Sequence, residues 1–283
     1  MKRLIVLPLI ILVAVSLACQ IMPGAASAAP TPTNAPVVSQ SEQVLPTEVV
    51  ATLVPTPTAE PTSSKPMPVD TKTAANGNYH EEFDGATPNW KFDYITGNTQ
   101  KDAEVATQDG ILKVKLAVVG REETHLKLIE TEHTYSDVTV STQFENFGAT
   151  HNGIGVICRV NKDGWYEFHI ESGGLWKIER YDASLKAANK VPYVAIAEGG
   201  SKFISAGINK KNTIAMACIG DQFRFFINDQ ELTNNIMRIP PTKLDEFKKY
   251  SQGTTGLAVY SWGDTATPVE VHFEYFDTKV PQQ

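Results

Sequence analysis

No aromatic residue occurs before Tyr79, although the chain of 283 residues holds 12 Phe, 9 Tyr and 4 Trp. Residues 19–76 contain ten of the 17 prolines and only six charged residues. A segment of this composition cannot bury enough apolar surface to form a core. We therefore expect residues 19–76 to be a disordered Thr/Pro-rich tether, and residues 77–281 to fold as one domain.

The chain also lacks a cluster of basic residues. Its formal net charge is −7, and the expected domain by itself carries the same charge. Because proteins contact phosphate backbones through clustered Lys and Arg, this composition excludes nucleic acid as a partner.

Several catalytic and metal-binding motifs are missing as well. There is no His-Glu-x-x-His, no Cys/His spacing typical of zinc, no phosphate-binding glycine loop and no Gly-x-Ser-x-Gly. The pair Gly153 and Gly155 lacks the third glycine of a dinucleotide-binding turn.

The first residues have the features of an export signal. Lys2 and Arg3 precede an apolar run that ends at Ala18, too short to span a bilayer comfortably. The sequence 15–19, Val-Ser-Leu-Ala-Cys, resembles a bacterial lipobox, which implies a signal peptide over 1–18, lipidation of Cys19 and a membrane anchor. Cleavage after Ala28, within Ala-Ser-Ala, is the alternative and would give a secreted protein. Both alternatives place the domain outside the cytoplasm.

The domain shows the period-two alternation of β-strands, with turn residues every 8–12 positions. The sequence predicts an all-β fold, a two-sheet antiparallel jelly-roll sandwich. A proline start and helical spacing predict one short helix over 241–250. The expected strands are 111–118, 124–130, 137–146, 153–160, 165–171, 175–181, 212–219, 222–228, 254–261 and 269–279.

The meander over 153–181 can be aligned by requiring apolar residues to share one face. A short loop at 172–174 then places Trp165 opposite Tyr181 on the other, outer face. The same register adds Arg159, Glu167, His169 and Glu179 to that face, with Arg159 beside Glu167. We expect the two rings to form an exposed platform for a sugar, with the polar side chains bonding its hydroxyls. Burial of the rings under another segment is the alternative.

Three sequence features together resemble the concanavalin-like jelly rolls of laminin-G-type modules, legume-type lectins and bacterial glycan-active proteins. They are Phe83-Asp84-Gly85 with Trp90, the hairpin over 223–229, and the closing strand over 271–276. The resemblance implies the sandwich fold and a structural calcium near Glu82, Asp84, Glu274 and Asp277. No other cofactor is expected.

The function expected from these features is non-catalytic recognition of a glycan or cell-wall polysaccharide. Glu167, His169 and Glu171 also resemble the acidic strand of laminarinase-type hydrolases, in which Glu167 and Glu171 would be the catalytic pair. In such enzymes the two carboxyl groups lie about 5 Å apart. A protein-interaction or envelope-assembly domain is a third alternative.

Two of the three cysteines share strand parity with core residues. Cys158 follows the parity of Ile154 and Val156, and Cys218 that of Ile214 and Met216. In an oxidising compartment we expect Cys158 and Cys218 to pair as a disulfide, two separate buried thiols being the alternative.

Overall fold

The computed structural model describes residues 77–87, 89–96, 103–117, 123–263 and 266–282. The expected signal peptide, Cys19 and the tether lie outside the described residues. No helix in the described ranges is long and apolar enough to cross a membrane.

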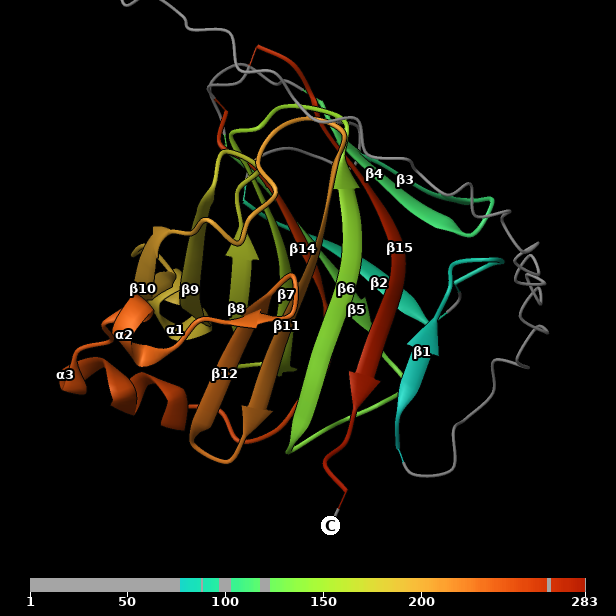
Figure 1. Cartoon of the computed structure of the whole chain (residues 1–283). Coiled ribbons are helices and arrows are strands. Elements are labelled where there is room, and N and C mark those ends of the chain that lie inside the picture. Colours follow the sequence, from blue (N-terminus) through green and yellow to red (C-terminus); the bar gives the residue numbers. More distant parts are fainter. Residues whose placement is uncertain (1–76, 88, 97–102, 118–122, 264–265, 283) are drawn as a thin grey trace, which may run out of the picture. The chain divides into compact units, whose positions relative to one another are not determined.

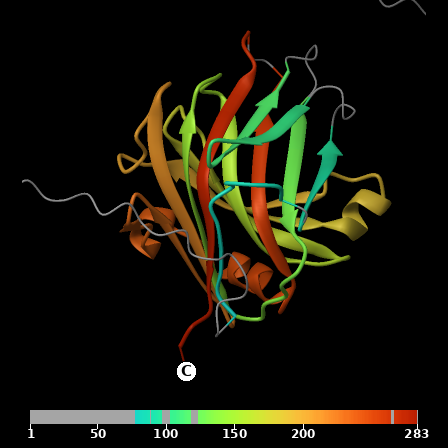
Figure 2. The same cartoon turned by 90° about the vertical axis from the view of Figure 1, so that its right-hand side faces the viewer.

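Two antiparallel sheets lie face to face, as Figures 1 and 2 show. The eight-stranded sheet runs in the order β13 (Gln230–Glu231), β12 (Gln222–Ile227), β11 (Lys210–Ile219), β6 (Val138–Asn146), β15 (Val269–Lys279), β4 (Ile111–Leu116) and β3 (Ala103–Gln108), and β1 (Tyr79–Glu81) also pairs with β15. The seven-stranded sheet runs in the order β10 (Tyr193–Gly200), β9 (Leu175–Asp182), β8 (Gly164–Ile170), β7 (Asn152–Val160), β14 (Thr254–Ser261), β5 (Thr124–Glu130) and β2 (Trp90–Thr96). The predicted two-sheet antiparallel sandwich is confirmed.

The core lies between the sheets, where alternate side chains of both meet. In β6 every second residue is buried, the pattern of a strand with one face on the core. In β8, by contrast, all seven residues are buried. The outer face of the seven-stranded sheet therefore has a second buried layer, which a simple sandwich does not require.

All ten predicted strands are present, with ends within two residues of those expected. The strands that the sequence did not reveal are β1, β2, β3, β10 and β13. Four of them, β2, β3, β10 and β13, are the edge strands of the two sheets, and β1 has only three residues. The predicted helix over 241–250 is divided into α3 (Pro241–Leu244) and a 3₁₀ turn over Asp245–Lys248. Two more short helices occur, α1 (Ala183–Ala187) and α2 (Asn234–Met237).

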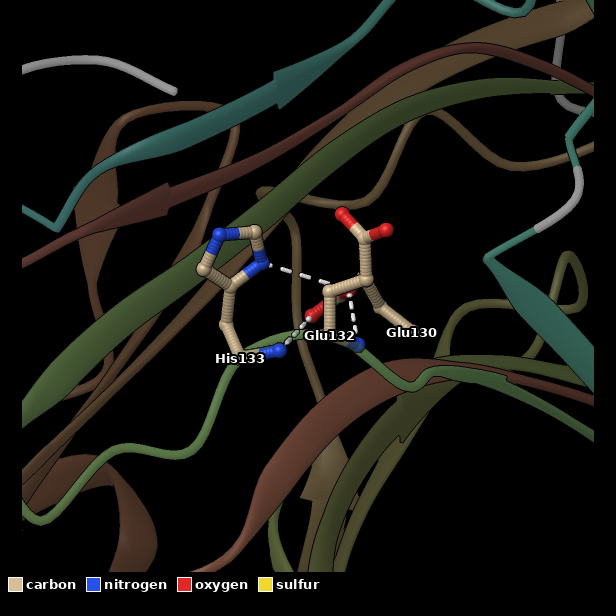
Figure 3. Close-up of side chains that lie close together, drawn as sticks. All are labelled: Glu130, Glu132 and His133. Carbon is tan, nitrogen blue, oxygen red and sulfur yellow. Dashed lines mark hydrogen bonds and ion pairs between the residues drawn. The ribbon is translucent and has the colours of Figure 1, made fainter. Parts of the chain in front are cut away.

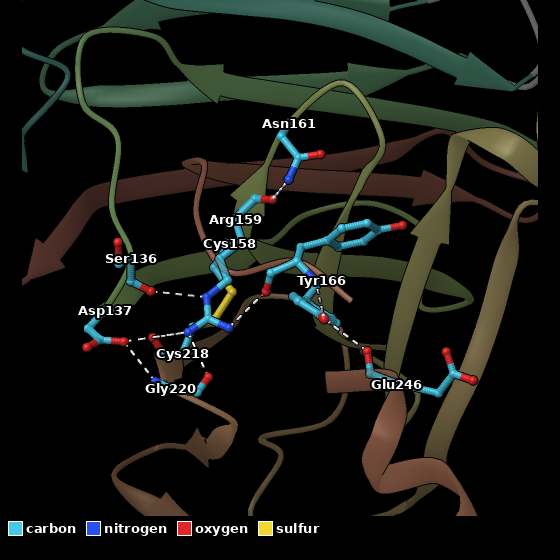
Figure 4. Close-up of a disulfide and its surroundings, with 10 residues drawn as sticks. Ser136, Asp137, Cys158, Arg159, Asn161, Tyr166, Cys218, Gly220 and Glu246 are labelled. Carbon is cyan, nitrogen blue, oxygen red and sulfur yellow. Dashed lines mark hydrogen bonds and ion pairs between the residues drawn. A yellow bond between two sulfur atoms is a disulfide. The ribbon is translucent and has the colours of Figure 1, made fainter. Parts of the chain in front are cut away.

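A disulfide joins Cys158 of β7 to Cys218 of β11 and thus links the two sheets (Figure 4). Both cysteines are fully buried, on the inward faces that their strand parity indicates. The bridge closes a segment of 60 residues that contains β8, β9 and β10.

Candidate functional site

The outer face of the seven-stranded sheet brings together most of the side chains predicted to bind a ligand. β8 and β9 pair Trp165 with Tyr181, Glu167 with Glu179 and His169 with Lys177, which confirms the predicted register. The rings of Trp165 and Tyr181 stack with centroids 3.8 Å apart and planes 8° from parallel.

These rings do not form the exposed platform that the sequence predicts, because Trp165 is 4% and Tyr181 5% exposed. The Tyr193 ring of β10 packs edge-on against both, and the ammonium of Lys127 lies 4.2 Å from the centre of the Trp165 ring. Side chains of the neighbouring strands therefore cover the pair. Glu179 is also buried, and its carboxylate forms a 2.8 Å ion pair with Lys177.

Glu167 lies at the centre of this layer, with no exposed surface. Its carboxylate accepts hydrogen bonds from the Tyr260 hydroxyl and from Trp165 Nε1, the latter at 3.2 Å. Two imidazoles flank it, with His125 Nε2 at 3.7 Å and His169 Nδ1 at 3.4 Å. Burial raises the pKa of Glu167, but these neighbours together lower it below its ordinary value, so the carboxylate is ionised.

His125 lies beside the ionised Glu167, but burial favours the neutral form of its own imidazole. Burial is the largest influence and lowers the pKa of this imidazole from 6.5 to about 3, against the attraction of Glu167. His125 is therefore neutral at physiological pH. Its ring also contacts the Tyr193 hydroxyl, so the polar groups of β5, β8, β10 and β14 form one connected network.

Arg159 is not on this face, and the prediction that it pairs with Glu167 is wrong. Ile157 lies opposite Glu167 instead. Arg159 adopts a left-handed backbone (φ 53°) where the β7–β14 register shifts, and its side chain therefore points toward the eight-stranded sheet (Figure 4). There the guanidinium donates to four backbone carbonyls, those of Ser136, Cys218, Gly220 and Tyr250.

Glu167 and Glu171, the catalytic pair implied by the resemblance to laminarinase-type hydrolases, have different environments. Glu167 is enclosed, whereas Glu171 follows the end of β8, is 17% exposed and lies 4.0 Å from His151. Four residues of extended strand separate their Cα atoms by about 13 Å. A glycoside hydrolase needs both carboxylates to reach one glycosidic bond. The enclosure of Glu167 argues against this role for the pair.

One end of the outer face is different, because polar atoms there lack partners. His169 is fully buried; its Nδ1 atom faces Glu167, but its Nε2 atom has no hydrogen-bond partner, and neither has the buried Nε1 of Trp262, among the described residues. The two rings lie 6.1 Å apart. Native proteins satisfy nearly all such groups, so a pair of adjacent exceptions marks a place where a polar partner belongs.

Trp262 itself is partly exposed, and it stacks at 5.3 Å on Tyr260. Its other neighbour is His151, whose side chain is 52% exposed and whose ring lies at 6.0 Å. We call Trp262, His169, His151 and Glu171 the rim site. Four residues of this face were not predicted from the sequence: Trp262, Tyr260, His125 and Tyr193. Ala258, Tyr260 and Trp262 alternate along β14 and just beyond its end, which indicates that they share one face of the sheet. The alternation does not show that β14 lies beside β7.

Three of the four residues expected to hold calcium form ion pairs with other side chains. Glu274 binds Lys211, whereas Glu82 and Asp277 flank His80 from either side. Of the described His, Cys, Asp and Glu residues, a group of three with ligand atoms within 4.8 Å of one another occurs elsewhere, at Glu130, Glu132 and His133. That group contains none of the four residues, and the structural calcium implied by the resemblance stays a prediction.

No protein-family model and no curated protein matches the chain. Among solved structures, the Bacillus licheniformis β-glucanase is similar to it at 11% identity over 74% of this chain and 100% of that one, with a TM-score of 0.48. The carbohydrate-binding module CBM66 of Bacillus subtilis is similar at 12% identity over 66% and 92%, with a TM-score of 0.41. The laminarinase catalytic domain of Thermotoga petrophila is similar at 9% identity over 72% and 97%, with a TM-score of 0.47. From matches this distant we draw no conclusion about a ligand or an activity.

Proposed function

We propose that the domain is a non-catalytic, extracytoplasmic recognition module that binds carbohydrate at the rim site. The observation that carries the proposal is the adjacent pair of His169 and Trp262, in which Nε2 of the imidazole and Nε1 of the indole have no hydrogen-bond partner among the described residues. Sugars offer both partners that such a pair needs, because hydroxyls bond to imidazole and indole nitrogens and the C–H face packs on an aromatic ring.

Accessibility decides where on the outer face a ligand enters. Trp165, Tyr181 and Glu167 are enclosed, whereas Trp262 and His151 are open to solvent in part. The unpartnered atoms themselves are buried, so a sugar hydroxyl reaches them after a side-chain rotation of Trp262. Glu171, at the same end, offers acceptor oxygens to further hydroxyls.

The extracytoplasmic location in the proposal rests on the expected leader and tether. An exported chain with a lipid at Cys19 would display this domain on a tether on the order of 150 Å long when extended. A hydrolase acting through Glu167 and Glu171 is not proposed, because Glu167 is enclosed and its carboxylate accepts hydrogen bonds from Trp165 and Tyr260.

A glycan array followed by calorimetry on the full chain tests this function. We expect Trp262→Ala to abolish glycan binding and Trp262→Phe, which keeps a ring but loses the N–H group, to weaken it. The matched control is Phe147→Ala, which removes another part-exposed ring, one that packs on His272 of the other sheet. An array without any bound glycan, or equal affinity of wild type and Trp262→Ala, would refute the proposal. In the first case, capture from envelope extract would test the protein-interaction alternative.

A further inference from the structure

Three side chains with metal-ligand chemistry gather where β5 ends, away from the rim site. Glu130 is the last residue of β5, and Glu132 and His133 lie in the segment that leads to β6 (Figure 3). One ligand atom from each lies within 4.8 Å of the others. The three donors come from four consecutive residues, so the chain itself holds them together.

Glu130 is fully buried, which is unusual for a carboxylate. Its oxygens accept the backbone N–H groups of Glu132 at 2.7 Å and His133 at 3.2 Å. No lysine or arginine of the described residues forms an ion pair with it, and its one ion-pair partner among them is His133. Each carboxylate oxygen has a second lone pair, so the carboxylate can still accept a cation.

His133 supplies the nitrogen donor of the group. Its Nδ1 atom is buried and makes no hydrogen bond, although it lies 3.2 Å from Oε1 of Glu130. The two atoms therefore lie close together without the geometry of a hydrogen bond. Glu132, in contrast, is exposed, so its side chain is free to close over the same point.

We propose that Glu130, Glu132 and His133 bind a divalent cation of the zinc class. A set of one imidazole nitrogen and two carboxylates suits Zn²⁺, which accepts mixed nitrogen and oxygen ligands in a four-coordinate site. Ca²⁺ and Mg²⁺ prefer sites made of oxygen alone, which argues against them here. The exposed side of Glu132 leaves the fourth position to water.

The position of this site gives it a structural consequence. The His133 ring lies 5.2 Å from the ring of Tyr79 in β1 and 6.1 Å from that of Tyr135. A bound cation would fix the segment between β5 and β6 against the first strand of the domain. Its binding energy would then add to the stability of the fold.

Calorimetric titration of the EDTA-dialysed full chain with zinc chloride tests the proposal, with a Cys19→Ser variant to remove the thiol that could bind zinc elsewhere. We expect one zinc ion per chain and a rise in the unfolding temperature on its addition. Glu132→Gln and His133→Gln should each weaken zinc binding by more than about tenfold, which is ~1.4 kcal/mol. Both side chains lie at or near the surface, so these variants should fold.

The matched control is His80→Gln, because His80 also lies between two carboxylates, but its two ring nitrogens face different ones. It should bind zinc as wild type does. The proposal is overturned by absence of zinc binding, by unchanged affinity in Glu132→Gln and His133→Gln, by loss of binding in His80→Gln, or by tighter binding of calcium than of zinc. None of these results depends on whether the rim site binds a glycan.

Discussion

Reduction or removal of the disulfide between Cys158 and Cys218 should destabilise the domain strongly. The bridge closes a segment of 60 residues. In the chain-entropy model, closing such a segment lowers the entropy of the unfolded chain by about 14 cal/mol/K, or about 4 kcal/mol at 25 °C. For a domain of this size the unfolding temperature should fall by roughly 8–16 °C.

Urea unfolding of wild type and of the Cys158→Ala/Cys218→Ala variant, each with and without dithiothreitol, measures this effect. The reductant should lower the unfolding midpoint of wild type and leave that of the variant unchanged. Both sulfurs are fully buried, so reduction of the folded protein should be slow. Equal midpoints for reduced and oxidised wild type would contradict the chain-entropy reasoning.

The remaining predictions concern buried polar groups. Arg159→Met should lower the free energy of unfolding by about 3–5 kcal/mol, because four carbonyls lose their donors, and chemical denaturation with Arg159→Lys as a partial replacement would test this. His125 has a pKa of about 3 in the folded chain and an ordinary value of 6.5, so the unfolded chain binds the extra proton first as pH falls. The contribution of neutral His125 to the free energy of unfolding is therefore complete above about pH 6.5. Between about pH 6.5 and pH 3 the free energy of unfolding falls by about 1.4 kcal/mol for each pH unit. In His125→Gln that slope should be shallower, and an unchanged slope would show that His125 is not the group responsible.

Strand pairing was predictable where turns and alternation agree. The short loop at 172–174 and the apolar parity of 165–181 together determine one register, and the structure has that register. Cys158 and Cys218 could be assigned to the core for the same reason. Alternation cannot show what lies above the second face of a sheet, and it therefore did not predict that Trp165 and Tyr181 are covered.

Arg159 shows a different limit of sequence analysis. Parity along β7 places it with the outward residues, but one left-handed residue at a β-bulge reverses the direction of its side chain. Nothing in the local sequence marks the bulge. The rim site was hidden for a third reason, since Trp262 and His169 lie far apart in the sequence and meet because β14 is inserted beside β7.

The neighbouring positions of Cys158 and Arg159 have a consequence for the order of events during folding. The Arg159 guanidinium contacts the backbone carbonyl of Cys218 itself, at 3.3 Å. If this contact and the one to Gly220 form while both thiols are still reduced, they would hold the second cysteine near the first. An oxidant would then meet two thiols that are already close together. Arg159 would act as a template for correct oxidation, and its own contacts would persist after the bond has formed.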